Sequence, residues 1–356
     1  MIGAPSKRLR LASRDVVGPV LILVLFLIIE ASVQPGFLSS SQILTLFNGS
    51  AIVALAAMGE AIVVLSGGFD LSVGSVLSVV NVLLAIHMGQ NTGDQILWIV
   101  LALGAGAGIG LLNGVLVAVL QIPSVVATLA TSFLWGGVAL LILKQPGGSV
   151  SSTFSDWFTG SHYGIPNALV LLALATLAWL AIKRTALGIS IYALGGDEGA
   201  AVANGVAPRT SLIGAYSLAG LFYGLAGVFL TAEISSGDPN IGGPLLLTIF
   251  ASVVLGGISF GGGRGDAAAA ILGAFILTLI ADILFALGVS SFYTSIFSGA
   301  VLIVALTVAN WGGQMTTWMR ARIETMRGRP QDMSTGQRGG AGDLLAGGPS
   351  AAGDVQ

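Results

Sequence analysis

Long apolar segments follow one another along most of the chain, separated by short polar or glycine-rich stretches. A helix needs about 20 apolar residues to cross the hydrocarbon core of a bilayer. Segments of about this length recur along the chain, so the pattern predicts an all-α, polytopic transmembrane helical bundle of about ten spans. The predicted spans are residues 16–36, 42–66, 71–89, 95–120, 123–145, 163–182, 210–232, 244–259, 267–288 and 291–311.

Basic residues indicate how this bundle is oriented, because Lys and Arg collect in the cytoplasmic loops of membrane proteins. With ten spans and the N-terminus inside, all of the 14 basic residues except Lys144 fall on the cytoplasmic side. Both termini and the 183–209 loop are therefore expected to be cytoplasmic. The predicted organisation is an N-terminal segment (1–15), a membrane domain (16–315) and a tail (316–356) with little to bury, which is expected to be largely disordered.

Composition narrows the possible classes of function. Hydrophobic residues make up 54% of the chain and charged residues 8%, against about 25% charged in soluble domains. The absence of cysteine excludes disulfides and thiolate metal sites, and His87 and His162 offer no clustered metal ligands. No basic stripe with interleaved aromatic residues indicates nucleic-acid binding. No Gly-Lys-Ser/Thr sequence forms a phosphate-binding loop, so the chain is expected to be a non-catalytic subunit without an ATPase site of its own.

A polar, glycine-punctuated island interrupts the apolar pattern between residues 183 and 206. Asp197 is a good helix N-cap, Glu198 suits the positive end of a helix, and Asn204-Gly205 is a good C-cap pair. The helix predicted between these caps has roughly two turns and is made of small residues. Because so short a helix buries little by itself, we expect it to dock onto another protein.

Two glycine-rich breaks, residues 67–75 and 256–266, follow similar Val-Val-Leu sequences, which hints at an internal duplication. Asp70 or Ser72 is expected to cap the helix after the first break. The first break has two open interpretations. It is either a plain turn between helices or a broken-helix element beside a transport pathway, where exposed backbone is tolerated because water is near.

Polar side chains inside the predicted spans are costly and therefore often functional. Glu30, Glu60 and Asp282 have no basic partner within the spans, so Glu30 and Glu60 are expected to be protonated or hydrogen-bonded to neighbours such as Ser50 or Asn48. Structural hydrogen bonding between helices remains the alternative for every polar residue in the spans. The candidate residues of a solute pathway are Glu60, Asp70, Asn81, Asn113, Thr128 and Asp282, with Thr131 as a further polar residue at membrane depth. The Gly-x-Gly sequences of residues 104–110 are interpreted as a ridge for close helix packing and not as a dinucleotide site, since no strand precedes them.

Four motifs, taken in order, resemble those of the ribose/xylose-type permeases of bacterial ABC importers, a branch that includes relatives of branched-chain amino-acid permeases. Together with the spans, the resemblance covers about residues 15–315. The motifs are Gly67–Ser75, Gly110–Gly114 followed by Ile122–Leu129, the 185–206 loop, and Val253–Gly265. Two places depart from the family pattern. Leu246, Leu247 and Thr248 stand where sugar permeases often carry Glu-Leu-Asp, which leaves the solute open, and Gly196-Asp197 replaces Gly-Asn, which preserves capping chemistry.

The resemblance implies a subunit of the bacterial inner membrane that works as a dimer with a second copy or a paralogue. It also implies an ATPase subunit that carries ATP-Mg, and a periplasmic solute-binding protein, while this chain itself binds no cofactor. The 185–206 loop would be the segment that docks on the ATPase. Its candidate coupling residues are Asp197, Glu198, Gly199, Ala200, Ala201, Ala203, Asn204 and Gly205.

The expected function is inward transport of a sugar or a similar polyhydroxylated solute. An amino acid or a furanose-like signal molecule remains possible within the same class of permease. The alternative class is an ion-coupled secondary transporter, in which Asp282, Glu30 or Glu60 would bind the proton.

Overall fold

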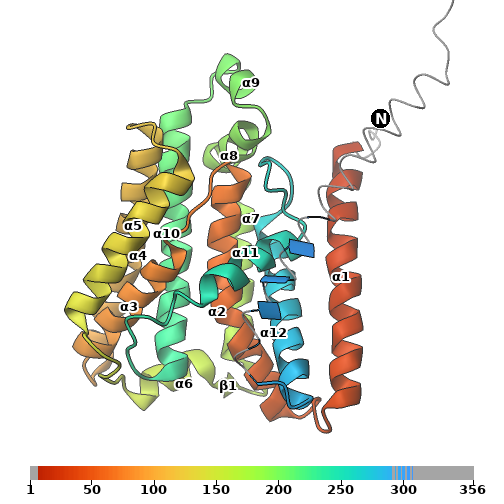
Figure 1. The fold of residues 1–356 in the computed structure, drawn as a ribbon, viewed down its shortest axis with the longest axis vertical. Helices are drawn as coiled ribbons and strands as arrows, with labels where there is room; N and C mark the ends of the chain where they lie inside the picture. Colours follow the sequence, from red (N-terminus) through yellow and green to blue (C-terminus); the bar gives the residue numbers. More distant parts are fainter. Residues whose placement is uncertain are drawn as a thin grey trace, which may run out of the picture. The chain divides into compact units, whose positions relative to one another are not determined.

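The computed structural model describes residues 7–290 and positions 293, 296–297, 299–300, 303–304 and 307, with side chains from residue 17 onward. These residues are mostly helical (Figure 1). The helices are α1 (Lys7–Val33), α2 (Ser40–Leu65), α3 (Val73–His87), α4 (Thr92–Ala118), α5 (Ser124–Ile142), α6 (Ser152–Thr159), α7 (Asn167–Ile182), α8 (Ala186–Gly196), α9 (Glu198–Ala203), α10 (Pro208–Ile234), α11 (Leu245–Leu255), the 3-10 turn η1 (Ala267–Ala269) and α12 (Ala270–Ala286). The strands β1 (Ser161–His162) and β2 (Ile165–Pro166) form a small antiparallel hairpin.

The first nine predicted spans each correspond to one apolar helix, whereas most of the tenth and the whole predicted tail lie outside the described residues. Among the described residues, five helical segments are long and apolar enough to cross a membrane, or six if the bent pair α7–α8 is one span. The apolar parts of α1, α3 and α11 are shorter. The chain is thus a multi-pass helical membrane protein, but ten full spans are not confirmed, because apolar length in the sequence does not reveal where a helix is interrupted.

Helix α2 forms the centre of the bundle. In the most apolar 18-residue stretch of α2, 94% is buried inside the protein, whereas in that of α5, which faces outward, 22% is buried. Large apolar side chains such as Phe133 and Leu141 of α5 and Leu177 of α7 are exposed. Because the surrounding medium is lipid, these exposed side chains are the expected outer surface of a membrane protein.

Helices α4 and α10 approach each other closely along one row of glycines. A Cβ atom on Gly106 or Gly110 would collide with the backbone carbonyl of Gly220 or Tyr216. The intervening Gly108 points away, with no described atom within 4 Å of such a Cβ. The ridge predicted at residues 104–110 therefore packs as expected, and the α-helical period places every fourth residue in the contact.

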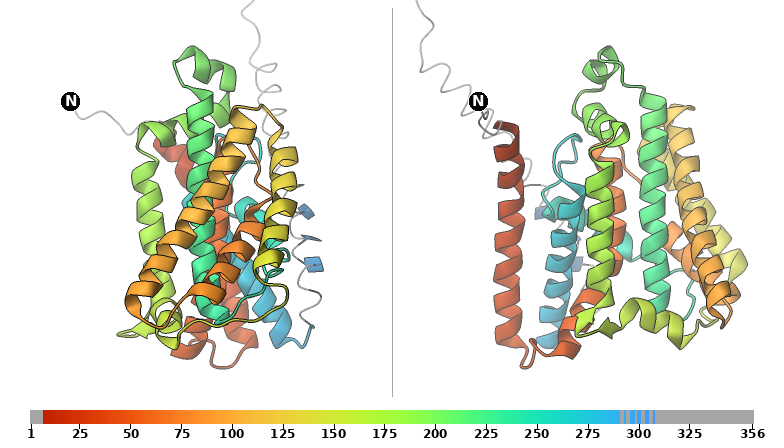
Figure 2. Two further views of the ribbon diagram at one scale, coloured as in Figure 1. Left: turned by 90° about the vertical axis from the view of Figure 1, so that its left-hand side faces the viewer. Right: turned by 180° about the vertical axis from the view of Figure 1, so that it is seen from behind.

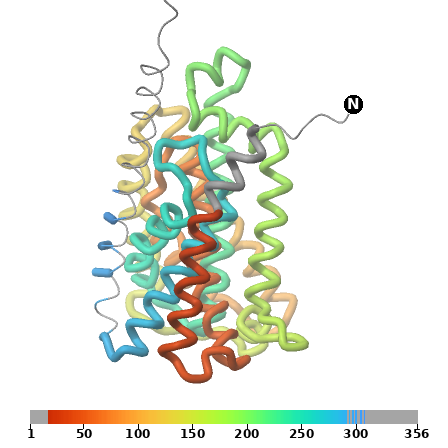
Figure 3. Tube along the Cα trace, turned by 90° about the vertical axis from the view of Figure 1, so that its right-hand side faces the viewer, coloured from red at the N-terminus to blue at the C-terminus, as the bar shows by residue number. Residues whose placement is uncertain are grey.

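Helix α7 turns by 79° into α8, and α9 follows α8 at the end of the bundle (Figure 2). In Figure 1, α9 projects at the top, while α6 and the β1–β2 hairpin lie at the opposite end. Lys183, Arg184 and Arg209 flank the α8–α9 segment in the chain, and the cytoplasmic location of this end of the bundle stays a prediction. Helix α1 packs against α12 at one side of the bundle (Figure 3).

Candidate functional site

In the structure, the irregular part of the first break is residues 66–72, between the end of α2 and the start of α3, and the name is used for these residues from here on. It begins where α2 ends in a glycine cap. Gly67 adopts a left-handed φ of 89°, its amide donates to Val64, and the amide of Gly68 donates to Val63. This pattern is a Schellman cap, which glycine favours because it lacks a Cβ. Asp70 and Ser72 are fully buried. The break is therefore an irregular segment inside the bundle and not a turn on its surface.

The Asp70 carboxylate organises the buried polar groups of this break. Its Oδ1 accepts hydrogen bonds from the Ser72 amide at 2.9 Å and the Ser72 hydroxyl at 2.6 Å. Asn113 of α4 donates to Ser72 Oγ at 2.8 Å and to Asp70 Oδ1 at 3.3 Å. Thr131 of α5 donates to Asn113 Oδ1 at 2.7 Å. Ser72 does occupy the N-cap position of α3, but its hydroxyl makes no capping bond because it is used by Asp70 and Asn113.

Glu60 of α2 lies directly beside this network and is fully buried. One carboxylate oxygen accepts from the Asp70 amide at 3.1 Å, and the other accepts from the Tyr223 hydroxyl of α10 at 2.9 Å. The prediction that Ser50 or Asn48 forms a hydrogen bond with Glu60 is wrong. They lie ten or more residues away on the same helix, about 15 Å along its axis, and Asn48 instead donates to the carbonyl of Thr159.

Side chains from α5 and α10 satisfy the open backbone of the break. Thr128 accepts from the Leu71 amide at 3.0 Å, Ser124 accepts from the Phe69 amide at 3.3 Å, and Tyr216 donates to the Phe69 carbonyl at 3.3 Å. Backbone groups at membrane depth must find partners inside the protein or in a water-lined cavity. The geometry is thus that of a broken helix held by its neighbours, and a role in solute passage remains a prediction.

Two of the predicted pathway residues lie away from this cluster. Asn81 of α3 donates to Thr231 Oγ1 and to the carbonyl of Ser236, and it accepts from the Asp238 amide at 2.7 Å, so it joins α3 to the end of α10. Asp282 is on α12, which packs against α1 and its buried Glu30. The Glu30 carboxylate has no hydrogen-bond partner among the described residues. The structure therefore brings together Glu60, Asp70, Asn113 and Thr128 and separates the other two.

The second break, defined here as residues 256–266, repeats the local construction of the first. Gly257 has a φ of 81°, its amide donates to Val254, and the next amide donates to Val253. Asp266 then accepts from the amide two residues ahead, that of Ala268, as Asp70 does from Ser72. The shared Val-Val-Leu-(Ser/Gly)-Gly sequence thus produces the same helix end. A similar aspartate turn follows each end, but at a different distance along the chain, so the shared helix end is what supports the predicted internal duplication.

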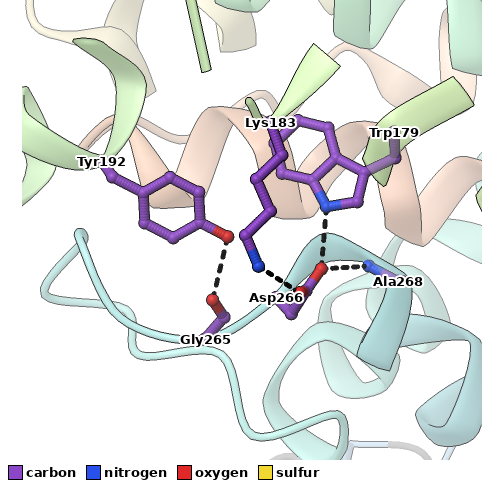
Figure 4. A network of polar contacts seen from close by, with 6 residues as sticks. All are labelled: Trp179, Lys183, Tyr192, Gly265, Asp266 and Ala268. Atoms are coloured by element: carbon purple, nitrogen blue, oxygen red, sulfur yellow. Dashed lines mark hydrogen bonds and ion pairs between the residues drawn. The ribbon is translucent and has the colours of Figure 1, made fainter. Parts of the chain in front are cut away.

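Asp266 also ties the second break to the end of α7 (Figure 4). Its Oδ1 accepts from the indole nitrogen of Trp179 at 2.7 Å, and its Oδ2 forms an ion pair with Lys183. The hydroxyl of Tyr192 in α8 donates to the carbonyl of Gly265 at 3.0 Å. The Lys183 ammonium group lies 5.5 Å from the centre of the Tyr192 ring, a distance at which a cation–π attraction acts.

Helix α9 has the caps that the sequence predicted. Asp197 accepts from the Ala200 amide at 2.9 Å, Asn204 is the C-cap, and Gly205 has a φ of 84°. The six residues of α9 lie between these caps and make about 1.7 turns, as the predicted length of roughly two turns requires. Ala201 is buried, whereas the other predicted coupling residues are exposed. A cavity of about 530 Å³ beside α9 is lined by Glu198, by Val117, Ala118 and Gln121 near the end of α4, and by Ala207, Pro208, Arg209 and Leu212 at the start of α10.

Sequence reasoning did not single out the two tyrosines that complete the first break. Tyr216 and Tyr223 are seven residues apart on α10, a spacing that places both hydroxyls on one face of a helix. This spacing of two tyrosines inside an apolar span is the sequence signal that could have identified them as a buried polar pair. The bond between Lys183 and Asp266 had no such signal, because 83 residues separate the two in the chain.

Comparisons with known proteins agree with the helical architecture. The family described as "Branched-chain amino acid transport system / permease component" matches residues 42–306. A ribose import permease of Escherichia coli strain K12 is 33% identical over 296 residues, which cover 81% of this chain and 91% of the relative. A ribose import permease of Bacillus subtilis strain 168 is 36% identical, with coverage of 81% and 91%. A fructose import permease of Rhizobium meliloti is 32% identical, with coverage of 82% and 84%. No solved structure matches the chain.

Proposed function

Because the chain belongs to the permease family of branched-chain amino-acid transport systems, we propose that it is the membrane subunit of an ATP-binding-cassette importer. Its solute is a sugar or a similar polyhydroxylated molecule, and it works in the bacterial inner membrane. The observation that carries this proposal is that relatives named as sugar import permeases align with more than four fifths of the chain, while the family match spans α9 and both breaks.

The proposed partners follow from what this chain contains. ATP-Mg binds on a separate ATPase subunit, since the sequence has no phosphate-binding Gly-Lys-Ser/Thr loop. That subunit contacts α9, whose exposed small side chains and neighbouring cavity offer a surface for docking. A periplasmic solute-binding protein delivers the solute at the opposite end, and a second copy or a paralogue completes the pathway.

The proposed mechanism needs no covalent chemistry from this chain. Docking and ATP turnover on the partner shift the permease between outward-open and inward-open states. A bound partner shifts such an equilibrium only if it binds one of the two states more tightly than the other. The first break is suited to this change. Its backbone is held by side-chain hydrogen bonds from α5 and α10 in place of a continuous helix, and Asn113 of α4 holds its Ser72 side chain.

The test is uptake into proteoliposomes that contain this chain and the ATPase, with the binding protein added outside and labelled ribose or fructose as the probe. We expect uptake to require ATP inside and to be insensitive to an uncoupler that abolishes the proton gradient. Uptake that persists without ATP and disappears with the uncoupler would overturn the proposal. It would then favour the ion-coupled transporter, in which Glu30, Glu60 and Asp282 are the candidate proton sites.

A further inference from the structure

Three glycine-containing segments that are distant in the sequence meet at the end of α8. The amide of Gly263, in the second break, donates to the carbonyl of Leu65, the last residue of α2, at 3.0 Å. Gly195 of α8 lies against this bond. A Cβ on Gly195 would collide with the Leu65 carbonyl oxygen and would lie 2.7 Å from the Gly263 nitrogen. The fit has no room for a methyl group, because contacts below about 3 Å between such atoms are strongly repulsive.

The contact is close on both sides of Gly195. A Cβ on Gly262 would lie 2.6 Å from the Gly195 carbonyl oxygen, and a Cβ on Gly67 would lie 3.6 Å from the Gly195 Cα. Thus the C-terminal turn of α8 is wedged between the start of the first break and the loop of the second. Backbone touches backbone here, so a displacement of α8 cannot be absorbed by rotation of a side chain.

Helix α9 is joined to this contact without a flexible linker. Asp197 is at once the C-cap of α8 and the N-cap of α9, with its amide donating to Ala193 and its carboxylate accepting from Ala200. At the end of α7, which precedes α8, Trp179 and Lys183 hold Asp266, and Tyr192 within α8 holds the carbonyl of Gly265. A force applied at α9 is therefore delivered through a short, capped segment that is fixed to the second break at several points.

The two breaks also contact each other away from α8. Phe69 of the first break packs edge-on against Phe260 of the second, with ring centres 5.2 Å apart. Phe250 of α11 stacks on Phe69 at 6.3 Å and meets Phe260 edge-on at 6.2 Å. Such aromatic pairs each contribute about 0.5–1.5 kcal/mol beyond the apolar area they bury. Movement of one break is thereby coupled to movement of the other.

We infer that Gly195 is the positioning residue through which displacement of α9 is passed to both breaks at once. The inference deepens the proposed function, on which it rests, because it assumes that the ATPase docks at α9. Gly195 touches neither solute nor ATPase in this scheme. It acts by keeping the backbone of α8 in contact with Leu65 and with the Gly262–Gly263 loop, so that the polar cluster around Asp70 moves when α9 moves.

The test compares Gly195→Ala with Gly196→Ala, its neighbour in the same helical turn. A Cβ on Gly196 has no described atom within 4 Å, so this variant adds the same methyl group without the clash. Each variant is purified with the ATPase and reconstituted, and solute uptake and ATP hydrolysis are measured together. We expect Gly195→Ala to co-purify with the ATPase but to move about tenfold less solute per ATP hydrolysed, a ratio equivalent to ~1.4 kcal/mol. Gly196→Ala should keep the normal ratio.

A second pair of variants keeps the inference testable if Gly195→Ala does not fold. Lys183→Met removes the ion pair with Asp266 and should also lower the ratio of solute moved to ATP hydrolysed, whereas Lys183→Arg, which retains the charge, should preserve it. Arg184→Met is the control, since Arg184 is exposed. A normal ratio in both Gly195→Ala and Lys183→Met would overturn the inference while leaving the proposed function intact. Failure of the unmodified chain to bind the ATPase would instead overturn the proposed function.

Discussion

The Tyr223 hydroxyl donates to the Glu60 carboxylate at 2.9 Å, which joins α10 to the central helix α2 across 163 positions of the sequence. Both side chains are fully buried. The second Glu60 oxygen holds the Asp70 amide, so one carboxylate connects two helices and the first break. Buried polar groups of this kind are costly when a partner is removed, since the remaining donor or acceptor is left without a hydrogen bond.

The first prediction concerns the stability of this connection. Glu60→Leu leaves the Tyr223 hydroxyl and the Asp70 amide without their acceptor, at a cost of about 1–3 kcal/mol for each group. Tyr223→Phe removes a donor and leaves Glu60 bonded to Asp70, so its cost should be about half as large. Thermal melting in detergent measures both. Equal melting temperatures for Glu60→Leu and the unmodified chain would show that the bonds contribute nothing to stability.

The second prediction concerns Asn113, which bridges α4, α5 and the first break. Asn113→Leu has a similar volume but removes the donor that Asn113 supplies to Asp70 and Ser72 and the acceptor that it supplies to Thr131. We expect uptake to fall by about tenfold or more, because the break loses about 1–3 kcal/mol per unsatisfied group. Thr131→Val is the matched control, since it removes the outermost bond of the same network and a bond to the Thr128 carbonyl within α5, but leaves Asn113 bonded to Asp70 and Ser72. Uptake that is lower in Thr131→Val than in Asn113→Leu would contradict this order.

The third prediction concerns docking at α9. Ala200 is exposed, so Ala200→Glu should leave folding and membrane insertion intact. Its added bulk and charge should weaken the contact with the ATPase through steric clash and desolvation. Co-purification of the ATPase and solute uptake should therefore fall together, whereas Ala200→Ser, which stays small, should behave as the unmodified chain does. Normal uptake by Ala200→Glu at normal expression would remove α9 from the docking surface.

The fourth prediction concerns sidedness, which follows from the placement of basic residues. The chain has no cysteine, so single introduced cysteines can be labelled without background. Ala200→Cys should be reached by an impermeant thiol reagent only from the cytoplasmic side. Tyr163→Cys, in the exposed tip of the β1–β2 hairpin at the other end of the bundle, should be reached only from the periplasm. Labelling of both cysteines from one side would show that the predicted topology is wrong.

The sequence by itself determined the features that depend on neighbouring residues. Apolar length predicted the long apolar helices α1–α5, α7 and α10–α12, because burial in lipid acts on each segment separately, but it did not predict α6 or α8. The caps of α9 were correctly predicted from Asp197 and Asn204-Gly205, since a cap is a bond between residues three or four positions apart. The paired Val-Val-Leu approaches likewise encode two similar helix ends.

The tertiary structure alone decided what these elements contact. Glu60 pairs with Tyr223, Asp70 with Asn113, and Lys183 with Asp266, and none of these partners could be chosen from the sequence, because many polar residues lie at comparable depth. The same holds for Gly195 and Gly196, which are adjacent residues of the same type. Only one of them lies against Leu65 and Gly263, because the direction in which a helical residue points is set by how the whole helix packs.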